Sequence, residues 1–267
     1  FRHLKRSSHF IVGPEGFLYL DRKKNGVIDG KDKVAYVTIV RASNAYVTDN
    51  KGSVVGISID NSRFNNMTIL NKFKKIVAIN LFKNNVENIN IEGLPELRFL
   101  RILERNDLRT LTKIKDVNKL SYFSVSGLNT PNFKKFTGVK GLRKIDISGM
   151  GIESFDGLEN MPNLKEAEIS SNGEETSKNF KSLSGIPKGH KLEKLKLSTS
   201  VTTDIKGIAN FSHLKKLELW AGKRDLTDFT PLSKLKKLEK LEMTVSGIND
   251  FSFLSNMPKL KQIVTYH

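Results

Sequence analysis

The sequence predicts an α/β solenoid, in which a parallel β-sheet forms the concave side and 3₁₀ or short helical segments form the convex side. Three observations support this fold class. The chain repeats itself with a period of about 22 residues, each repeat opens with alternating apolar side chains, and each then carries apolar side chains at every third position. Such repeats stack into a solenoid because each unit can bury its apolar side only against its neighbours.

The alternating segments mark the strands of the predicted sheet. In one unit the apolar residues are Leu142, Ile145 and Ile147. Side chains alternate between the two faces of a strand, so these ladder residues point into the core and their neighbours point to the concave surface. The lead residues of successive units are Val34, Val54, Ile76, Leu97, Leu120, Leu142, Leu164, Leu192, Leu214, Leu238 and Leu260.

The second half of each unit predicts the return segment on the convex side. Before Ile76, for example, apolar residues recur every third position at Phe64, Met67, Leu70 and Phe73. This spacing suits a 3₁₀ helix, in which residues i and i+3 align. A short polar residue at the ninth position of several units can satisfy backbone groups in the turn after the strand. These residues are Ser62, Asn84, Asn172, Ser200 and Ser246.

The pattern that runs from Leu142 to Met161, and again from Leu238 to Met257, resembles the leucine-rich repeats of bacterial internalins and of eukaryotic phosphatase regulators. The resemblance implies a leucine-rich repeat fold that binds partner macromolecules and shares no common active site. Segments rich in Lys and Asn favour a bacterial source. Internalins usually carry a helical N-terminal cap and an immunoglobulin-like module after the repeats, and neither is evident here.

The predicted organisation is therefore a β-rich N-terminal cap over residues 1–33, followed by a leucine-rich repeat solenoid of about ten units over residues 34–267. Within the cap, the segment Gly16 to Leu20 is the candidate strand. No stretch of the chain is long and apolar enough to span a membrane. The first residues lack the apolar run of a signal peptide, which leaves open whether an upstream segment was removed.

Composition excludes several kinds of chemistry. The chain contains no cysteine, so disulfides, thiol nucleophiles and cysteine-ligated metals are impossible. The five histidines lie at no spacing typical of a metal site or catalytic triad, and we expect each to be a solvated surface residue. They are His3, His9, His190, His213 and His267. Gly149 and Gly151 are expected to serve a turn, not a nucleotide-binding loop. We expect no enzyme activity and no cofactor.

One segment has the register of an EF-hand calcium loop. Asp21, Asn25, Asp29 and Asp32 would supply oxygen ligands, but Lys23 occupies a ligand position. The favoured alternative is a β-hairpin from Leu18 to Ile28 that turns at Asn25 and Gly26. A second irregular feature is the extra loop Ser171–Lys181 in the longest unit. Insertions in solenoids often serve binding, so this loop is a candidate binding segment.

The residues between the ladder positions predict the binding surface. In the N-terminal half they are apolar or aromatic, and aromatic and arginine side chains are the usual anchors of protein interfaces. These residues are Phe82, Phe99, Arg101, Leu103 and Tyr122. Scattered surface hydrophobics, or contact with the N-terminal cap, remain the alternatives.

In the C-terminal half the third position of each unit is mostly lysine and the fifth mostly acidic, so we expect the two to pair. The lysines are Lys144, Lys194, Lys216 and Lys240, interrupted by Glu166, and the acidic residues are Asp146, Glu168, Glu218 and Glu242. Trp220, the only tryptophan, stands at a seventh position among them and is the strongest single contact candidate.

The sequence thus predicts a non-enzymatic protein-binding module, secreted or exposed on a bacterial surface, that recognises a partner such as a host protein through its concave face. The predicted contacts are Phe82, Phe99, Arg101, Leu103, Tyr122, Lys194, Lys216, Trp220 and Lys240. The net charge of +17 supports an alternative function, the binding of a polyanion such as nucleic acid, acidic glycan or anionic lipid. The oligomeric state stays open.

Overall fold

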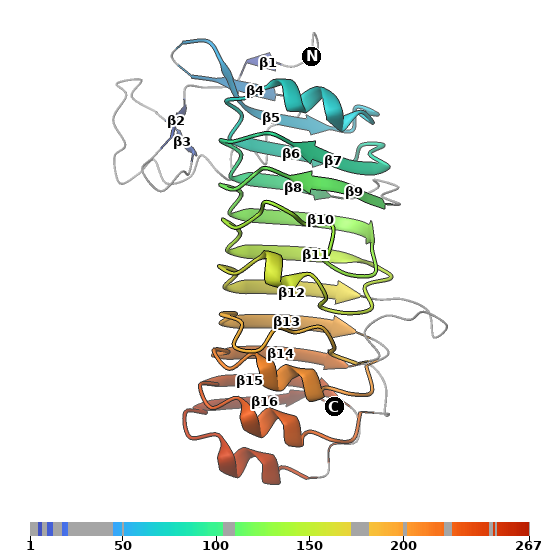
Figure 1. Cartoon of the computed structure of the whole chain (residues 1–267), viewed down its shortest axis with the longest axis vertical. Helices are drawn as coiled ribbons and strands as arrows, with labels where there is room; N and C mark the ends of the chain where they lie inside the picture. Colours follow the sequence, from blue (N-terminus) through green and yellow to red (C-terminus); the bar gives the residue numbers. More distant parts are fainter. Residues whose placement is uncertain are drawn as a thin grey trace.

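The protein forms a solenoid around one long β-sheet (Figure 1). The computed structural model describes residues 5–6, 10–12, 18–20, 45–49, 51–103, 110–171, 182–199, 202–221, 226–245, 248 and 250–266. Within this part, twelve strands lie in the order β1-β4-β5-β6-β8-β10-β11-β12-β13-β14-β15-β16. Units that follow each other in sequence are therefore neighbours in the sheet, as the predicted stacking requires.

All pairings from β5 onward are parallel. The strands are β5 (Val54–Asp60), β6 (Ala78–Phe82), β8 (Phe99–Leu103), β10 (Tyr122–Asn129), β11 (Lys144–Met150), β12 (Glu166–Ser171), β13 (Lys194–Thr199), β14 (Lys216–Ala221), β15 (Lys240–Val245) and β16 (Gln262–Tyr266). Successive strands pair at equivalent positions, as with Ile145 opposite Ala167 and Leu195 opposite Leu217. The predicted repeat frame is confirmed.

The N-terminal strands depart from this parallel array. β4 (Ala45–Thr48) runs antiparallel to β5 and pairs in parallel with β1 (Lys5–Arg6). β2 (Phe10–Val12) and β3 (Leu18–Leu20) form a separate antiparallel pair, so part of the predicted strand at residues 16–20 is extended. The predicted turn at Asn25 and Gly26, and the first strand of the predicted repeat unit that starts at Val34, lie outside the described residues.

The core is a single ladder of buried apolar side chains between the sheet and the return segments. Phenylalanines pack against one another in its middle: the ring centroids of Phe123 and Phe136, in one unit, are 5.5 Å apart, and those of Phe133 and Phe155, in successive units, are 6.2 Å apart. All four side chains are fully buried. Because each unit completes the core of its neighbour, the sheet face that remains available is the concave one.

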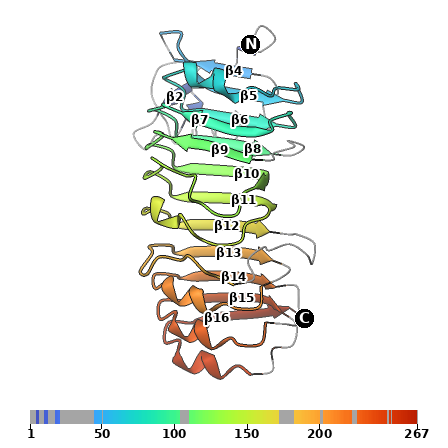
Figure 2. The same cartoon turned by 45° about the vertical axis from the view of Figure 1, so that its right-hand side comes forward.

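The convex side carries the predicted 3₁₀ helices, which Figure 2 shows lined up opposite the sheet in the C-terminal units. They are η1 (Met67–Lys72), η2 (Leu158–Asn160), η3 (Lys206–Asn210), η4 (Thr230–Lys234) and η5 (Ser252–Asn256). Two units carry strands there instead, β7 (Asn88–Glu92) and β9 (Thr110–Lys115), which form a parallel pair. In the described residues of the unit that starts at Leu120, the convex side has neither a 3₁₀ helix nor a named strand. Ile89 and Ile91 explain β7, since buried side chains two residues apart suit a strand.

The turns after the strands satisfy buried backbone groups as predicted. Asn84 is fully buried, and its Nδ2 donates hydrogen bonds to the carbonyl oxygens of Ile59 (2.7 Å) and Phe82 (2.9 Å). Its Oδ1 accepts from the backbone N–H of Ser62 at 3.2 Å. The side chain thus ties two successive units together. Asn172, Ser200 and Ser246 lie outside the described residues.

The two glycines Gly149 and Gly151 serve backbone geometry, as expected. Gly151 has φ of +87°, a conformation that glycine adopts without steric cost. A Cβ at Gly149 would lie 2.0 Å from the carbonyl oxygen of Leu128, so only glycine permits this close approach of neighbouring units. The positive φ of Gly151 agrees with the predicted turn, whereas the close packing at Gly149 was not predicted.

His190 contradicts the prediction that every histidine is a solvated surface residue. It is buried; its Nδ1 accepts a hydrogen bond from the backbone N–H of Leu192 (3.2 Å), and its Nε2 lies 3.2 Å from the carbonyl oxygen of Met161. The ring also packs edge-on against Phe211. The prediction was wrong because Gly189 stands where neighbouring units place a large apolar residue, and the imidazole fills that space. His213 is half-buried, and the other three histidines lie outside the described residues.

No helix in the described ranges is long and apolar enough to cross a membrane.

Candidate interaction surface on the concave sheet

Concave side chains form three rows that run across the strands, as the register of the sheet dictates. The first row contains Ala78, Phe99, Tyr122, Lys144, Glu166, Lys194, Lys216, Lys240 and Gln262. The middle row contains Ser58, Asn80, Arg101, Ser124, Asp146, Glu168, Lys196, Glu218, Glu242 and Val264. The last row contains Ser126, Ser148, Ser170, Ser198, Trp220, Thr244 and Tyr266.

The last row begins further towards the N-terminus with Asp60, Phe82 and Leu103, which pair in register on β5, β6 and β8. Every predicted contact residue therefore lies on the concave face.

The concave side chains of β5, β6, β8 and β10, which we call the N-terminal concave area, are mostly covered. Phe99 and Tyr122 stack with centroids 4.9 Å apart and planes 7° apart, and Phe99 exposes only 5% of its surface. Buried Asn80 donates to the hydroxyl of Ser58 at 3.0 Å. The predicted aromatic cluster thus exists, but much of it is packed instead of open to solvent.

The other predicted contacts in this area are half-buried: Phe82, Arg101, Leu103 and Tyr122. The Lys83 ammonium group lies 4.9 Å from the centroid of the Phe82 ring, a cation–π contact.

The concave side chains of β11 to β16, the C-terminal concave area, carry the predicted lysine–acid pairs. Glu166 lies 3.6 Å from the Lys144 ammonium and 2.5 Å from that of Lys194. The hydrogen bond from Lys194 lowers the pKa of Glu166, although partial burial opposes this. Lys196 pairs with Glu168, and Lys240 pairs with Glu242. Three of the four first-row lysines therefore have an acidic partner, although Lys144 and Lys194 share the one carboxylate of Glu166.

Lys216 is the exception among these lysines. It is exposed, and in the described part of the chain no carboxylate lies within ion-pair distance of it. Its neighbours across the strands are Lys194 and Lys240, so three cations stand side by side. A shallow hollow of about 140 Å³ lies beside it, lined by Lys144, Glu166, Ala167, Glu168, Lys194, Leu195, Lys196, Lys216 and Glu218.

Asp146 marks the boundary between the two areas. Burial and the nearby Glu168 carboxylate raise its pKa, whereas a hydrogen bond from the Ser124 hydroxyl (3.3 Å) opposes the shift.

The last row ends in two exposed aromatic side chains. Trp220 is 46% exposed and Tyr266 is 52% exposed, with Thr244 between them in register. They stand two strand spacings apart, about 10 Å. The remainder of the row, from Ser126 to Ser198, consists of half-buried serines. The exposure of Trp220 agrees with its selection from the sequence.

Tyr266 and the serine row were missed by the sequence analysis. The sequence does contain the pattern that identifies them. Tyr266 is the seventh residue of the unit that starts at Leu260, and serine is the seventh residue of the units that start at Leu142, Leu164 and Leu192.

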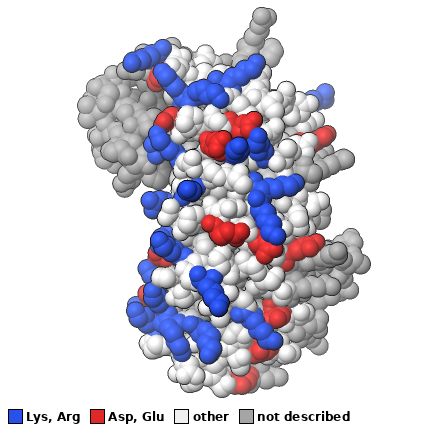
Figure 3. Space-filling view, viewed as in Figure 1, with Lys and Arg blue, Asp and Glu red and all other residues white. Residues whose placement is uncertain are grey.

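Other predicted features give no site in the described residues. The calcium-loop candidates Asp21, Asn25, Asp29 and Asp32, and nearly all of the Ser171–Lys181 loop, lie outside them. No group of three or more His, Asp or Glu side chains that could hold a metal ion occurs among the described residues. On the face that Figure 3 displays, acidic side chains lie among the basic ones, so this face is mixed in charge.

Comparisons with known proteins agree with this architecture. A family model for the leucine-rich repeat domain of the endo-beta-N-acetylglucosaminidase EndoS matches residues 81–172. The structure of internalin C2 from Listeria monocytogenes is similar at a TM-score of 0.50 and 16% identity, over 80% of this chain and 81% of that one. No curated protein sequence matches the chain.

Two further structures are similar at lower TM-scores. One is an internalin (InlF) from Listeria monocytogenes, with a TM-score of 0.46 and 17% identity over 90% of this chain and 77% of that one. The other is a leucine-rich repeat protein from Leptospira interrogans, with a TM-score of 0.41 and 16% identity over 82% and 60%.

The parallel sheet, its repeat frame and the family match define the chain as a leucine-rich repeat solenoid. Its fold is of the internalin-like type, so the resemblance predicted from the repeats is confirmed at the level of fold. Solenoids of this kind present extended concave surfaces that serve as interaction modules.

Proposed function

We propose that the chain recognises a protein partner through its C-terminal concave area, with Trp220 as the central anchor. The observation that carries the proposal is the exposure of this indole, 46% of its surface, between the small polar side chains of Ser198 and Thr244. A large aromatic side chain on that face fills no core. Trp and Tyr are over-represented among the residues that dominate binding energies in protein interfaces.

The surroundings of Trp220 favour a defined partner. Tyr266 offers a second exposed ring on the same face, and Lys216 on the same strand as Trp220 offers a cation that no carboxylate of the described residues pairs with. The paired lysines nearby already have glutamate partners. A complementary partner would therefore present an apolar patch for the two rings and a carboxylate for Lys216.

We extend the proposal to the setting of the protein. A bacterial protein that is secreted or displayed on the cell surface would meet such a partner outside the cell, and a host protein is one such partner. The similarity in fold to an internalin supports this part of the proposal. The function needs no catalytic group.

The experiment is a pull-down from host-cell extract and surface fractions at low and at roughly 0.5 M salt, because that salt concentration screens exposed charges. We expect a discrete protein that is retained at high salt and lost from the Trp220→Ala variant. Phe251→Ala is the matched control, because Phe251 is 41% exposed but precedes η5 on the convex side.

Two results would contradict the proposal. Equal loss of the partner from Phe251→Ala would mean that the effect is not specific to the concave face. Retention of nucleic acid or acidic polymer alone, eluting with salt and indifferent to Trp220→Ala, would support the polyanion alternative instead.

A further inference from the structure

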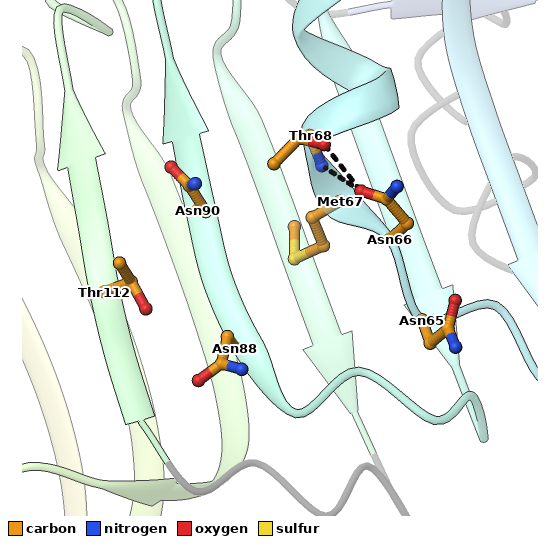
Figure 4. A pocket seen from close by; sticks show the side chains of 7 residues that line it. All are labelled: Asn65, Asn66, Met67, Thr68, Asn88, Asn90 and Thr112. Atoms are coloured by element: carbon orange, nitrogen blue, oxygen red, sulfur yellow. Dashed lines mark hydrogen bonds between the residues drawn. The ribbon is translucent and has the colours of Figure 1, made fainter.

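A hollow on the convex side differs in chemistry from the charged surface around it. Its volume is about 450 Å³, and it lies where η1 meets β7 and β9 (Figure 4). The described residues that line it, which we call the amide hollow, are Asn65, Asn66, Met67, Thr68, Asn88, Asn90 and Thr112. None of them is charged, in a chain with 45 Lys and Arg and 28 Asp and Glu residues. Six of the seven carry side-chain hydrogen-bonding groups.

The hollow arises where the return segments change from a 3₁₀ helix to strands. Because Ile89 and Ile91 are buried in the core, the alternation of β7 turns Asn88 and Asn90 outward. The β7–β9 register pairs Ile89 with Leu111 and Asn90 with Lys113, so Thr112 is skipped and bulges from the pair. Figure 4 shows these side chains facing the start of η1 across the hollow.

Several polar groups in the hollow are available to a ligand. The Oδ1 atom of Asn66 accepts hydrogen bonds from the backbone N–H (3.1 Å) and the hydroxyl (2.6 Å) of Thr68, which fixes the amide and leaves its nitrogen free to donate. Asn65 and Thr112 make no side-chain hydrogen bond with the described residues.

Asn90 also lines the hollow, and its side chain is half-buried. Its Oδ1 is buried and yet has no hydrogen-bond partner in the described part of the protein. A buried acceptor of this kind is unfavourable unless a polar group from outside pairs with it, so native structures hold few of them.

We propose that the amide hollow binds a neutral saccharide unit. An asparagine amide both donates and accepts hydrogen bonds, which matches sugar hydroxyls that do the same. A phosphate, carboxylate or cation would find no opposite charge among the described lining residues, so a charged ligand is disfavoured. A flat aromatic ligand would have no ring to stack on among the described lining residues.

The size of the hollow fits a small ligand, because binding pockets usually measure roughly 300–1,000 Å³. Three successive units contribute to it, through the start of η1, β7 and β9. A ligand held there would contact groups that only the stacked solenoid brings together.

The test titrates the full chain with methyl mannoside, methyl galactoside and N-acetylglucosamine, with glucuronate and inorganic phosphate as charged probes, by saturation-transfer NMR. We expect at least one neutral sugar to bind and neither charged probe to do so. Asn90→Ala and Thr112→Val should each weaken binding by about tenfold, the effect of losing hydrogen bonds to the ligand. Asn118→Ala is the matched control, because Asn118 is exposed outside the hollow.

The proposal is overturned if no neutral sugar binds, if both variants bind as tightly as the unmodified chain, or if the charged probes bind equally well. Circular dichroism of each variant checks that the solenoid is intact. Trp220→Ala should bind the sugar normally, so failure of this site and failure of the concave-face function can be told apart.

Discussion

The N-terminal and C-terminal concave areas occupy the same positions of the repeat frame, but they differ in how far their side chains reach solvent. In the first area Phe99 is 5% exposed and Asn80 is 2% exposed, whereas in the second Trp220 is 46% exposed and Tyr266 is 52% exposed. The repeat frame therefore determines which face a side chain occupies but not whether that face is open. Stability should depend on the aromatic residues of the first area, and binding on those of the second.

The same contrast holds for polar groups. Ser58 and Asn80 form a buried hydrogen bond in the N-terminal area, so their polarity serves the fold. In the C-terminal area Lys194 and Glu166 pair at the surface, where ion pairs contribute little stability and remain free to exchange partners. The following predictions test this division, from the largest expected effect to the smallest.

Phe99→Ala should reduce the free energy of unfolding by about 3 kcal/mol, because removing a buried phenylalanine leaves a cavity. It also removes the stacked contact with Tyr122. Urea unfolding followed by circular dichroism measures the change. The variant should keep partner binding, once folded, within a factor of about two. A strong loss of binding without a loss of stability would reverse the roles of the two areas.

Tyr266→Ala should show the opposite of Phe99→Ala, with a small effect on stability and a larger effect on partner binding. Its ring is 52% exposed on the last strand, so stability should change by less than about 0.5 kcal/mol. Binding of the captured partner should weaken by about 1 kcal/mol, less than for Trp220→Ala, because anchors near the centre of an interface contribute more than those at its rim. Surface plasmon resonance of both variants gives the ranking. Equal losses would move the centre of the interface towards β16.

His190 allows a pH test of the core beneath the C-terminal area. Burial lowers the pKa of His190 below its ordinary value of 6.5, although the hydrogen bond to Met161 opposes the shift. The folded state favours the neutral ring of His190. The contribution of this ring to the free energy of unfolding is therefore fully present above pH 6.5 and is lost as the pH falls through the lowered pKa. The unmodified chain should therefore lose stability as the pH falls below about 6.5.

The matched variant is His190→Phe, which keeps a ring at this position but cannot be protonated. Its loss of stability over the same pH range, measured by thermal unfolding, should be smaller than that of the unmodified chain. An identical pH dependence in the two proteins would assign the effect to other groups.

The sequence predicted the buried ladder residues well, because the same positions are buried in each repeat unit. The lead and ladder residues from Ile57 to Met243 are buried as expected, since each apolar position has a counterpart in the units on either side. Trp220 was found for the same reason: its position in the frame places it outside the core.

The predictions failed or fell short where local substitutions change the packing. His190 is buried because Gly189 leaves space beside it. Phe251 belongs to the threefold apolar pattern and yet is 41% exposed, whereas Phe253, outside the pattern, is buried beside Phe229. The amide hollow was not predicted, because it depends on a bulge at Thr112 and on the change from η1 to β7, neither of which has a repeating signal.

The smallest predicted effect concerns the charges of the C-terminal area. Glu166→Gln removes the partner of Lys144 and Lys194 while keeping the shape of the side chain. Because all three side chains are at least 35% accessible to solvent, stability should fall by no more than about 0.5 kcal/mol, and the difference should shrink further at high salt. Thermal unfolding at two salt concentrations measures it.

The same substitution should raise the association rate of a partner that presents a carboxylate, because it frees Lys194 beside Lys216 and Lys144 three strands away in the same row. Lys119→Ala is the control, since its ion pair with Glu96 lies off the concave rows. If Glu166→Gln destabilised the fold as strongly as Phe99→Ala, the charged pairs would hold the solenoid together, and the division between a structural N-terminal area and an exposed binding area would fail.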